Sequence, residues 1–397
     1  MPNPGPLAGI RVVDFGRFIA GPYCAMLLAD MGADVIRVDR RQGSEDRYVA
    51  PIASSGDGTL FVTLNRNKRS LTLDTAKPES AEIIRLLVAR ADVVVANLPI
   101  DVLKKMALDY DALRAIKPDI ILARISTFGP DGPYARRVGF DTVAQAMSGA
   151  MSLTGFPEHA PVRDIVSFED YGTALHSAFG VMVALYHRAR TGEGQLVDGS
   201  LLATGVTFMQ SLLAERSVLD IERRQTGNAG FHTGPADTYR TSDGWIVVSI
   251  IGTDMFARWA RLVGREDLLA DPCFADDQSR ANHHHVLAEI MNAWLSTRTS
   301  AQAVADFEAA RIPAGPVLHL GEVLEDPQVR ARELLKYVEY PGAPKPVPMA
   351  DTAVRLSATP GGIRHRAPLL GEHTDAVLAE LGYGPGDIKA LRQNEVV

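Results

Sequence analysis

Short apolar runs alternate with stretches of helical spacing along roughly the first third of the chain. Four segments have the apolar continuity of strands that are buried on both faces: 9–15, 34–39, 92–96 and 119–125. Three segments between them place their apolar residues at helical spacing: 23–31, 80–90 and 110–116. Buried strands separated by helices predict a parallel sheet covered by helices, and therefore a doubly wound α/β domain.

The pattern changes further along the chain. Residues 171–190 predict a long helix, which ends in arginines and a glycine-containing turn. A strand over 195–199 and a helix over 201–215 follow, whereas residues 223–235 have neither periodicity. Beyond them the pattern predicts a mixed α/β module and a late helix: strand 245–251, helix 254–263, a helix that begins at Thr299 with capping-box spacing, and helix 374–381.

Composition places the chain among ordinary globular proteins. Of its 397 residues, 46% are hydrophobic and 22% charged, enough for two or three domains' worth of core. No apolar run approaches the ~18–20 residues of a membrane helix, and the first residues resemble no export signal. Cys24 and Cys273 are too few for a disulfide framework and lack metal-ligand spacing. We therefore expect a cytoplasmic protein without a metal site.

The net charge of −7 argues against binding to nucleic acid or to an anionic membrane surface. Basic pairs nevertheless follow several predicted strands: Arg37 and Arg40, Lys68 and Arg69, Lys104 and Lys105, Arg136 and Arg137. They form either a solvated rim or a rim that gathers the phosphates of a large anionic ligand, since α/β folds bind ligands at the carboxyl edge of the sheet. Spacing alone leaves both interpretations open.

The turn after the first predicted strand suits an anion. Residues 16–22 lead into a predicted helix, whose first N–H groups are free to bind a phosphate or carboxylate. The two glycines of this turn do not have the G-x-G-x-x-G spacing of dinucleotide-binding enzymes. A nicotinamide site is therefore disfavoured, although Asp39 stands where such enzymes place a ribose-binding acid.

Asp170 stands where the long helix is expected to begin. Its carboxylate could cap the orphan N–H groups of that helix, or it could act as a nucleophile held ionised by the positive helix end. Glu169 is a competing nucleophile at the neighbouring position. Residues 283–285 are three histidines. Because adjacent helical residues point about 100° apart, at most two of them could converge on a metal ion, and we expect this tract on the surface.

Motifs spread along the whole chain resemble the class III coenzyme A (CoA) transferases, which include formyl-CoA:oxalate, carnitine and bile-acid CoA-transferases and the α-methylacyl-CoA racemases. The matching segments include PLAGIRVVDF (6–15), AGP (20–22), GADVIRV (32–38), NKRSL (67–71), FGPDGPY (128–134), RARTGEGQLVDGS (188–200), IPAGPV (312–317), DPQV (326–329) and LGEHT (370–374). Each motif is weak by itself, and their order along the chain makes the resemblance specific.

The resemblance implies a large Rossmann-like domain built from both chain ends, a smaller α/β domain between them, and an interlocked homodimer. We therefore expect residues 1–205 to form the N-terminal part of the large CoA-binding domain and 206–224 to form a linker. Residues 225–325 would form the small domain, and 326–397 a second linker with the C-terminal part of the large domain.

The resemblance also makes Asp170 the expected nucleophile, because it takes the place of the family's catalytic aspartate. CoA and acyl-CoA are then substrates, and no permanently bound cofactor is expected. Matching positions imply CoA contacts at eight residues: Phe18, Ile19, Ala20, Arg37, Leu73, Asn97, Lys105 and Met106. Lys105 stands where the family often has arginine, so a forked phosphate contact becomes a point-charge contact.

Two departures from the family bear on function. Phe140 lies thirty residues before Asp170, where racemases carry a histidine, so the resemblance places it beside the substrate, although a phenyl ring cannot exchange a proton. The segment 227–234 resembles the glycine flap of the oxalate-type enzymes, but other residues interrupt its glycines after Gly230. With Phe231 and His232 there, we expect a stiffer flap shaped to another acid, with His232 touching the acceptor carboxylate.

The expected activity is transfer of CoA from an acyl-CoA to a carboxylic acid through aspartyl anhydride and aspartyl-CoA thioester intermediates. The family makes a small or dicarboxylic acid such as succinate the expected partner substrate. One alternative is an acyl-CoA racemase or isomerase with a different second base. Others are a CoA-binding paralogue without catalysis and, more distantly, a nicotinamide-dependent dehydrogenase.

Overall fold

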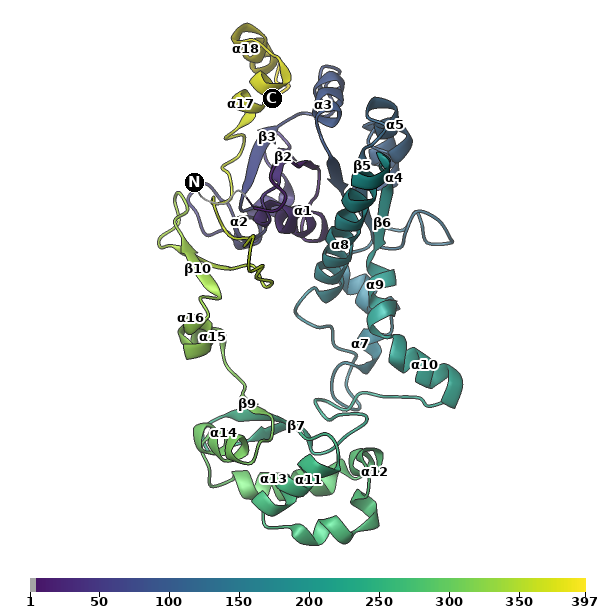
Figure 1. Ribbon diagram of the computed structural model, residues 1–397, viewed down its shortest axis with the longest axis vertical. Coiled ribbons are helices and arrows are strands. Elements are labelled where there is room, and N and C mark those ends of the chain that lie inside the picture. The colour runs from purple at the N-terminus through teal and green to yellow at the C-terminus, as the bar shows by residue number, and fades with distance from the viewer. Residues whose placement is uncertain (1–4) are drawn as a thin grey trace. The chain divides into compact units, whose positions relative to one another are not determined.

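The computed structural model of the protein describes residues 5–397 (Figure 1). The chain divides into two compact units. The first comprises the residues up to Ser148, Ile165–Met209 and Gln328–Val397, and the second comprises Gly149–Asp164 and Gln210–Pro327. Residues 149–164 thus group with the second unit, whereas we expected them in the large domain. They do so because Gln225 and Gly227 bond to the carbonyls of Thr154 and Gly155.

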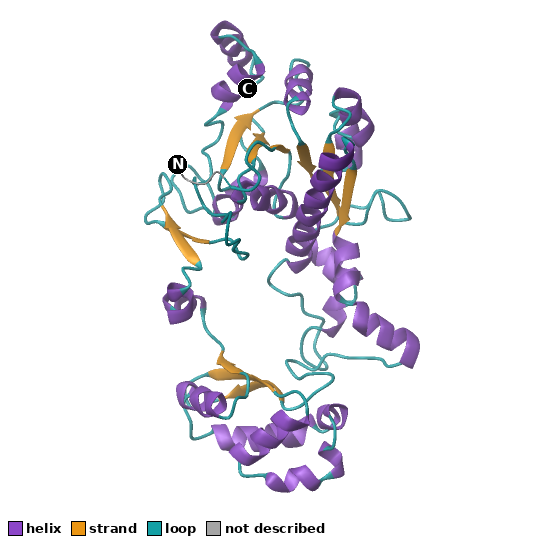
Figure 2. Ribbon diagram, viewed as in Figure 1, coloured by secondary structure: helices purple, strands orange, loops and turns teal. Residues whose placement is uncertain are grey.

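A six-stranded sheet forms the centre of the first unit. Its strands are β1 (Arg11–Asp14), β2 (Asp34–Asp39), β3 (Lys68–Thr72), β4 (Val93–Ala96), β5 (Ile121–Ser126) and β6 (Leu196–Ser200). They pair in the order β3-β2-β1-β4-β5-β6, and every pairing is parallel (Figure 2). The predicted parallel sheet is confirmed, and its order reverses between β1 and β4, which is where such sheets bind ligands.

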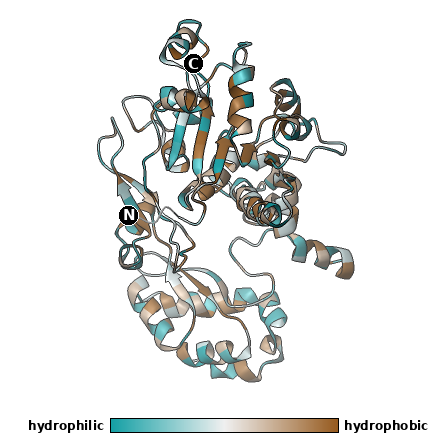
Figure 3. Cartoon of the chain, turned by 45° about the horizontal axis from the view of Figure 1, so that its top comes forward, coloured by the Kyte–Doolittle hydropathy of each residue, from teal (hydrophilic) through white to brown (hydrophobic). Residues whose placement is uncertain are grey.

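Helices cover both faces of this sheet because successive residues of each strand point to opposite sides. Val12 and Val93 pack with α1 (Ala20–Asp30) and α8 (Phe168–Thr191) on one face. The next residues along, Val13 and Val94, pack on the other face with four further helices: α3 (Ser80–Ala89), α5 (Tyr110–Ile116), α17 (Thr374–Leu381) and α18 (Pro385–Gln393). Figure 3 shows hydrophobic residues along the central strands. Helices from the C-terminal end therefore complete a core begun by the N-terminal end.

The remaining elements of the first unit are short. They are η1 (Glu45–Tyr48), α2 (Thr59–Leu64), α4 (Ile100–Lys105), α6 (Asp141–Met147), α9 (Leu201–Phe208), α16 (Pro327–Ala331, whose first residue belongs to the second unit), β10 (Leu335–Val338) and β11 (Val347–Ala350). The helix predicted over 201–215 is wrong as one piece, because it is interrupted at Met209. Helix α18 was not predicted, although Pro385 after Gly384 is a helix-start signal.

The second unit contains a three-stranded antiparallel sheet in the order β7-β8-β9. Its strands are β7 (Ala236–Arg240), β8 (Trp245–Ser249) and β9 (Ala314–Pro316). Its helical elements are α7 (Ala150–Leu153), α10 (Gln210–Leu219), α11 (Thr253–Leu262), η2 (Glu266–Ala270), η3 (Pro272–Phe274), α12 (Asp277–Asn282), α13 (His284–Leu295), α14 (Ser300–Ala309) and α15 (Leu320–Glu325). Trp259, Phe256 and Phe307 fill its core, and the predicted capping box at Thr299 is confirmed.

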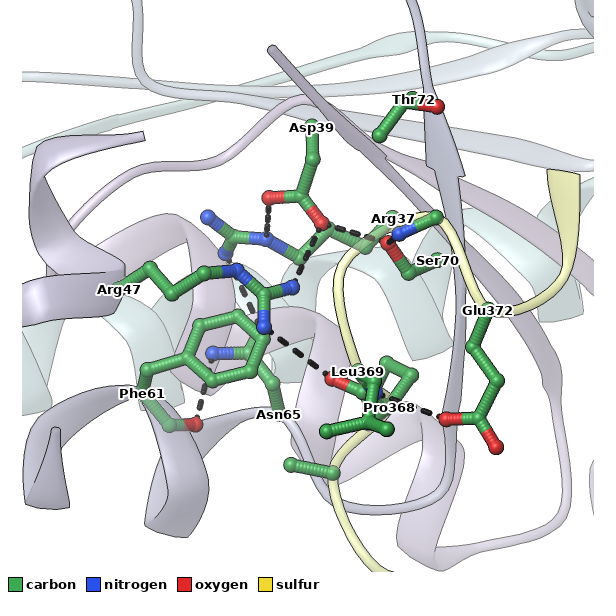
Figure 4. A network of polar contacts seen from close by, with 12 residues as sticks. Arg37, Asp39, Arg47, Phe61, Asn65, Ser70, Thr72, Pro368, Leu369 and Glu372 are labelled. Carbon is green, nitrogen blue, oxygen red and sulfur yellow. Dashed lines mark hydrogen bonds and ion pairs between the residues drawn. The ribbon is translucent and has the colours of Figure 1, made fainter. Parts of the chain in front are cut away.

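A buried ionic network ties β2 to the loop that follows it and to the C-terminal tail (Figure 4). The carboxylate of Asp39 accepts bonds from Arg37 at 2.9 Å and from Arg47 at 3.0 Å, and all three side chains are 0% exposed. Arg47 also bonds to Asp57 at 3.0 Å and to the carbonyl oxygen of Pro368 at 3.2 Å. Its guanidinium lies 3.6 Å from the ring centroid of Phe61. Arg47 thereby links β2 to the tail at Pro368, more than three hundred positions later in the sequence.

Replacing Arg47 tests how strongly the first unit depends on this network. Arg47→Met leaves the buried carboxylates of Asp39 and Asp57 without their shared cation, which we expect to lower the free energy of unfolding by about 3–5 kcal/mol. The midpoint of urea unfolding measures the loss. Arg85→Met removes an exposed ion pair with Glu82 and serves as the control, so its midpoint should match the wild type. Equal midpoints for both variants would contradict a structural role for the network.

Candidate active site

A cavity of about 370 Å³ opens at the carboxyl edge of the parallel sheet and is lined entirely by the first unit. Its walls come from segments that follow β1, β4 and β5, and from the first turn of α8: residues 17, 18 and 20, residues 97–101, residues 124–130 and 135–140, and residue 170. Arg40, Glu45 and Leu201 complete the lining. This is the switch point of the strand order, and the volume lies within the range typical of ligand sites.

The turn after β1 is fixed by Asn97. The N–H of Arg17 donates to Asn97 Oδ1, and Asn97 Nδ2 donates back to the carbonyl of Arg17, both at 2.8 Å. Gly16 lies directly against Gly21, so a Cβ at Gly16 would come within 2.8 Å of the Gly21 carbonyl carbon. The turn therefore has one conformation, which sets the position of Phe18 on the cavity wall.

Asp170 lies on the cavity wall, whereas Glu169 does not. The side chain of Glu169 is buried, and its Oε1 accepts a bond of 2.7 Å from Ser148 Oγ. Among residues 5–397 its Oε2 has no hydrogen-bond partner, and Gly205 packs against this carboxylate. Of the two neighbouring candidates, the helix therefore presents only Asp170 to a ligand in the cavity.

Asp170 is not the N-cap of α8, so that alternative is wrong. The helix begins at Phe168, three residues earlier than predicted, which places Asp170 in its first turn. Asp141 of α6 takes over the capping, because its Oδ1 accepts the N–H groups of Glu169 at 3.0 Å and Asp170 at 3.1 Å. Gln145 holds the other oxygen of Asp141 at 2.6 Å. The Asp170 side chain is thus spared the capping role.

Three carboxylates meet at this helix start, where burial and nearby negative charge raise the pKa of Asp170 and of Glu169. Burial raises the pKa of Asp170 to about 7, with the charges of Asp141 and Glu169 adding to the effect. Burial likewise raises the pKa of Glu169 to about 7. A carboxylate with a raised pKa is a stronger nucleophile once ionised, as Brønsted behaviour requires. Strong perturbation beside a cavity is typical of functional sites.

Of the eight expected CoA contacts, three line the cavity, three lie outside its lining and two are buried. Phe18, Ala20 and Asn97 line the cavity, as do the expected substrate residue Phe140 and Asp170. Ile19, Lys105 and Met106 lie outside its lining, at the start of α1 and the end of α4.

Arg37 and Leu73 require correction. Arg37 is 0% exposed with its guanidinium bonded to Asp39, Asp46 and Asn65, so it cannot also reach a phosphate. Leu73 is 1% exposed and belongs to the core on the α3 face of the sheet. Cations that do line the cavity are Arg17, Arg40, Arg124, Arg136 and Arg137. The basic pairs after the strands pointed to three of them, but Arg17 and Arg124 carried no such signal.

The expected flap residues lie in the second unit. His232 Nε2 lies 2.6 Å from Glu215 Oε1, and Arg223 donates two bonds to the same carboxylate at 2.8 and 2.9 Å. The guanidinium of Arg223 also lies over the ring of Phe231, 5.5 Å from its centroid. The N–H of Gly230 bonds to the carbonyl of Ala236 at 2.9 Å. Bonds from Arg223 and His232 lower the pKa of Glu215 to about 2. This segment is therefore tethered to α10.

Residues 5–397 contain no group of three or more His, Cys, Asp or Glu side chains placed to hold a metal ion. His283 and His284 instead point back to carbonyl oxygens of α12. Within the same described range, no helix has the length and apolar character needed to cross a membrane.

Comparison with known proteins defines the class. The family model for CoA-transferase family III matches residues 7–374, so the chain belongs to this family and is an enzyme of its class, which acts on CoA thioesters. A CaiB/BaiF family protein from Brucella suis has a similar solved structure, with a TM-score of 0.84, 34% identity, and coverage of 95% of this chain and 99% of that one.

Characterised relatives are similar over nearly their whole length. The chain is 34% identical to succinyl-CoA–D-citramalate CoA-transferase of Chloroflexus aurantiacus, over 99% of this chain and 98% of the relative. It is 36% identical to succinyl-CoA:mesaconate CoA-transferase of Haloarcula hispanica, covering 96% and 98%. Succinate–glutarate CoA-transferase of Agrobacterium fabrum is 34% identical, covering 96% and 97%.

The carboxylate cluster predicts an acid limb in the pH profile. Because only the ionised form of the expected nucleophile Asp170 could attack a thioester, kcat/KM should fall as the pH drops through about 7. Glu169→Gln removes one of the charges that raise the pKa of Asp170, so its limb should move about 0.5–1 unit lower. Glu82→Gln on α3 is the control, with an unshifted profile expected. An acid limb that stays in place in Glu169→Gln would contradict the coupling.

Proposed function

We propose that this protein transfers CoA from succinyl-CoA, or a similar small dicarboxylic acyl-CoA, to a second carboxylic acid, with Asp170 as the nucleophile. The observation that carries the proposal is the position of Asp170 on the cavity wall while Asp141 caps the helix. The donor class is supported by the relatives, whose names include succinyl-CoA or succinate with citramalate, mesaconate and glutarate as counterparts.

The proposed cycle keeps every bond in balance. The Asp170 carboxylate attacks the thioester carbonyl, the C–S bond breaks, and an aspartyl–acyl anhydride and the CoA thiolate result. The thiolate attacks the aspartyl carbonyl and displaces the donor acid, which leaves an aspartyl-CoA thioester. The acceptor carboxylate then displaces CoA through a second anhydride, and the thiolate takes the acceptor acyl group and regenerates Asp170. No step consumes water. Because water would hydrolyse the anhydride and thioester intermediates, its exclusion from the cavity protects them.

Backbone N–H groups at the start of α1 are suited to the oxyanions of these steps. Ile19 directly before α1 makes no side-chain cap bond to the N–H groups of the first turn, and Ala20 in that turn lines the cavity. One donor of this kind commonly lowers the barrier by about 3–4 kcal/mol. This gives Ile19 and Ala20 a role through their backbone rather than through their side chains.

The phosphates of CoA are assigned to arginines other than Arg37. Arg40 and Arg136 lie on the cavity with exposed side chains, and Arg137 is stacked at 4.0 Å on the ring of Tyr134. Arginine matches phosphate oxygens with paired N–H donors. Lys105 and Met106 remain expected contacts for the part of CoA that extends beyond the cavity.

Covalent trapping tests the nucleophile. Succinyl-CoA mixed with the enzyme and quenched with hydroxylamine or borohydride should leave a mass change that peptide mapping confines to Asp170. Asp170→Ala should show neither the label nor CoA exchange, with a loss of at least about 10³-fold in rate. Glu169→Gln should keep the label, because the side chain of Glu169 faces away from the cavity. Label on Glu169, or none at all while CoA still binds, would overturn the proposal.

A racemase is the weaker candidate because Phe140 occupies the cavity where a second base would be needed. Its phenyl ring can neither accept nor donate a proton. Deuterium from solvent should therefore not enter the carbon next to the thioester at a rate comparable to CoA exchange.

We further propose a homodimer in which α8 lies against the second copy. Exposed apolar side chains follow one face of this helix: Leu175, Phe179, Met182, Val183 and Tyr186. Their spacing is that of an amphipathic stripe, and Phe179 alone is 71% exposed. A contiguous apolar stripe of this kind is typical of a covered surface.

The dimer can be tested by sedimentation. Phe179→Glu places a charge in the stripe and should shift the wild-type dimer toward monomer or toward loss of soluble protein, since folding and association are coupled in such dimers. Lys389→Glu on α18 changes an exposed charge elsewhere and should keep the dimer mass. A monomeric wild type at micromolar concentration would contradict the assembly.

A further inference from the structure

Phe18 has a backbone conformation that its side chain does not favour. Its φ angle is 58°, in the left-handed region that glycine and asparagine occupy more readily. Such a conformation persists only where the surrounding structure enforces it, and it gathers at functional sites. Here the two bonds between Asn97 and Arg17 and the packing of Gly16 on Gly21 provide that enforcement.

The enforced conformation brings the ring of Phe18 against the ring of Phe140. The two ring centroids lie 5.5 Å apart with an angle of 79° between the planes, which is a favourable edge-to-face arrangement. Phe140, the residue directly before α6, nevertheless remains 62% exposed, so much of its side chain is accessible to a ligand. Both rings line the same cavity as Asp170.

We propose that Phe18 and Phe140 form an aromatic wall that selects acyl groups whose carbon next to the thioester carbonyl is unbranched. The inference rests on the proposed attack by Asp170, which brings that carbonyl and its first substituent into this cavity. An unbranched CH₂ group can lie flat against the two rings. A branch at this carbon would have to part rings whose positions are set by the turn on one side and by α6 on the other.

The wall assigns a steric role to two residues that otherwise have only a resemblance-based one. The resemblance assigns Phe18 to CoA and Phe140 to the substrate, and it implies no contact between the two side chains. Their contact makes them one determinant, so removing either ring should open the same space. The same wall bears on racemisation, because a substrate that can be racemised must carry a branch at that carbon.

The test compares succinyl-CoA with 2-methylsuccinyl-CoA branched at the carbon next to the thioester, using full-length enzyme and one acceptor acid. The wild type should prefer succinyl-CoA by on the order of 100-fold in kcat/KM, the upper range for one methyl group in a tight pocket. Phe140→Ala should reduce this preference at least about tenfold, chiefly by raising kcat/KM for the branched donor. Phe18→Ala should act in the same direction, and the double variant should add little.

Two further variants keep the test decisive. Tyr337→Ala removes a ring that is 60% exposed on β10 outside the cavity lining, and its preference should equal that of the wild type. Phe140→Leu is the fallback if Phe140→Ala does not fold, with a smaller change in the same direction. Because Asp170→Ala should not turn over either thioester, their dissociation constants can be measured for this variant, with and without Phe140→Ala. The ratio of these constants reports the steric discrimination in binding alone.

The outcomes separate the wall from the function on which it rests. If Asp170 is labelled by succinyl-CoA but Phe140→Ala leaves the preference unchanged, the wall is wrong and the CoA-transferase proposal stands. If no acyl-CoA labels Asp170, the proposed function fails, and an unchanged ratio of dissociation constants then rejects the wall as well. A relaxed ratio in both turnover and binding supports it.

Discussion

One carboxylate shared by two buried arginines holds the first unit of this protein together. Burial alone would raise the pKa of Asp39, but the charges of Arg37 and Arg47 outweigh it and bring the pKa to about 2. The triplet lies at the end of β2, and through Arg47 it reaches the carbonyl of Pro368 in the tail. Because a buried charge is costly without its partners, burial of Arg47 favours folding of the tail that carries Pro368 together with β2. Arg40 and Glu45, which lie between β2 and Arg47 in the sequence, line the cavity at the same sheet edge.

The start of α8 reverses the usual electrostatics of a helix end. A positive helix terminus ordinarily stabilises an ionised acid and lowers its pKa. Here Asp141 accepts the N–H groups of Glu169 and Asp170, and burial, with the charges of Asp141 and Glu169 adding to it, raises the pKa of Asp170 instead. The arrangement costs stability and gives Asp170 a pKa of about 7. Such local conflict is expected where function, rather than folding, selected the residues.

The cavity wall combines a turn of fixed conformation with cations on more exposed positions. Asn97 and the paired glycines fix the turn that carries Phe18, while Arg40, Arg136 and Arg137 extend from more exposed positions. The first group is suited to holding a reacting carbonyl, which tolerates little displacement. The second group is suited to following phosphates on a long ligand. Phe140 on the cavity wall cannot exchange a proton, which is one ground for proposing acyl transfer rather than racemisation.

Local patterns predicted many of the elements, because helix and strand periodicity depends only on neighbouring residues, but they missed β3 and α18. Strand 34–39 and helices 110–116 and 374–381 have the predicted bounds, and the ordered motifs placed the chain in its family. Spacing could not decide between Glu169 and Asp170, since one residue rotates a helix by about 100°. Nor could spacing reveal that the guanidinium of Arg37 is bonded to Asp39 and Asp46, or that Asp141 caps α8 from 28 residues away. Those outcomes depend on which groups the folded chain buries together, and only the tertiary structure decides that.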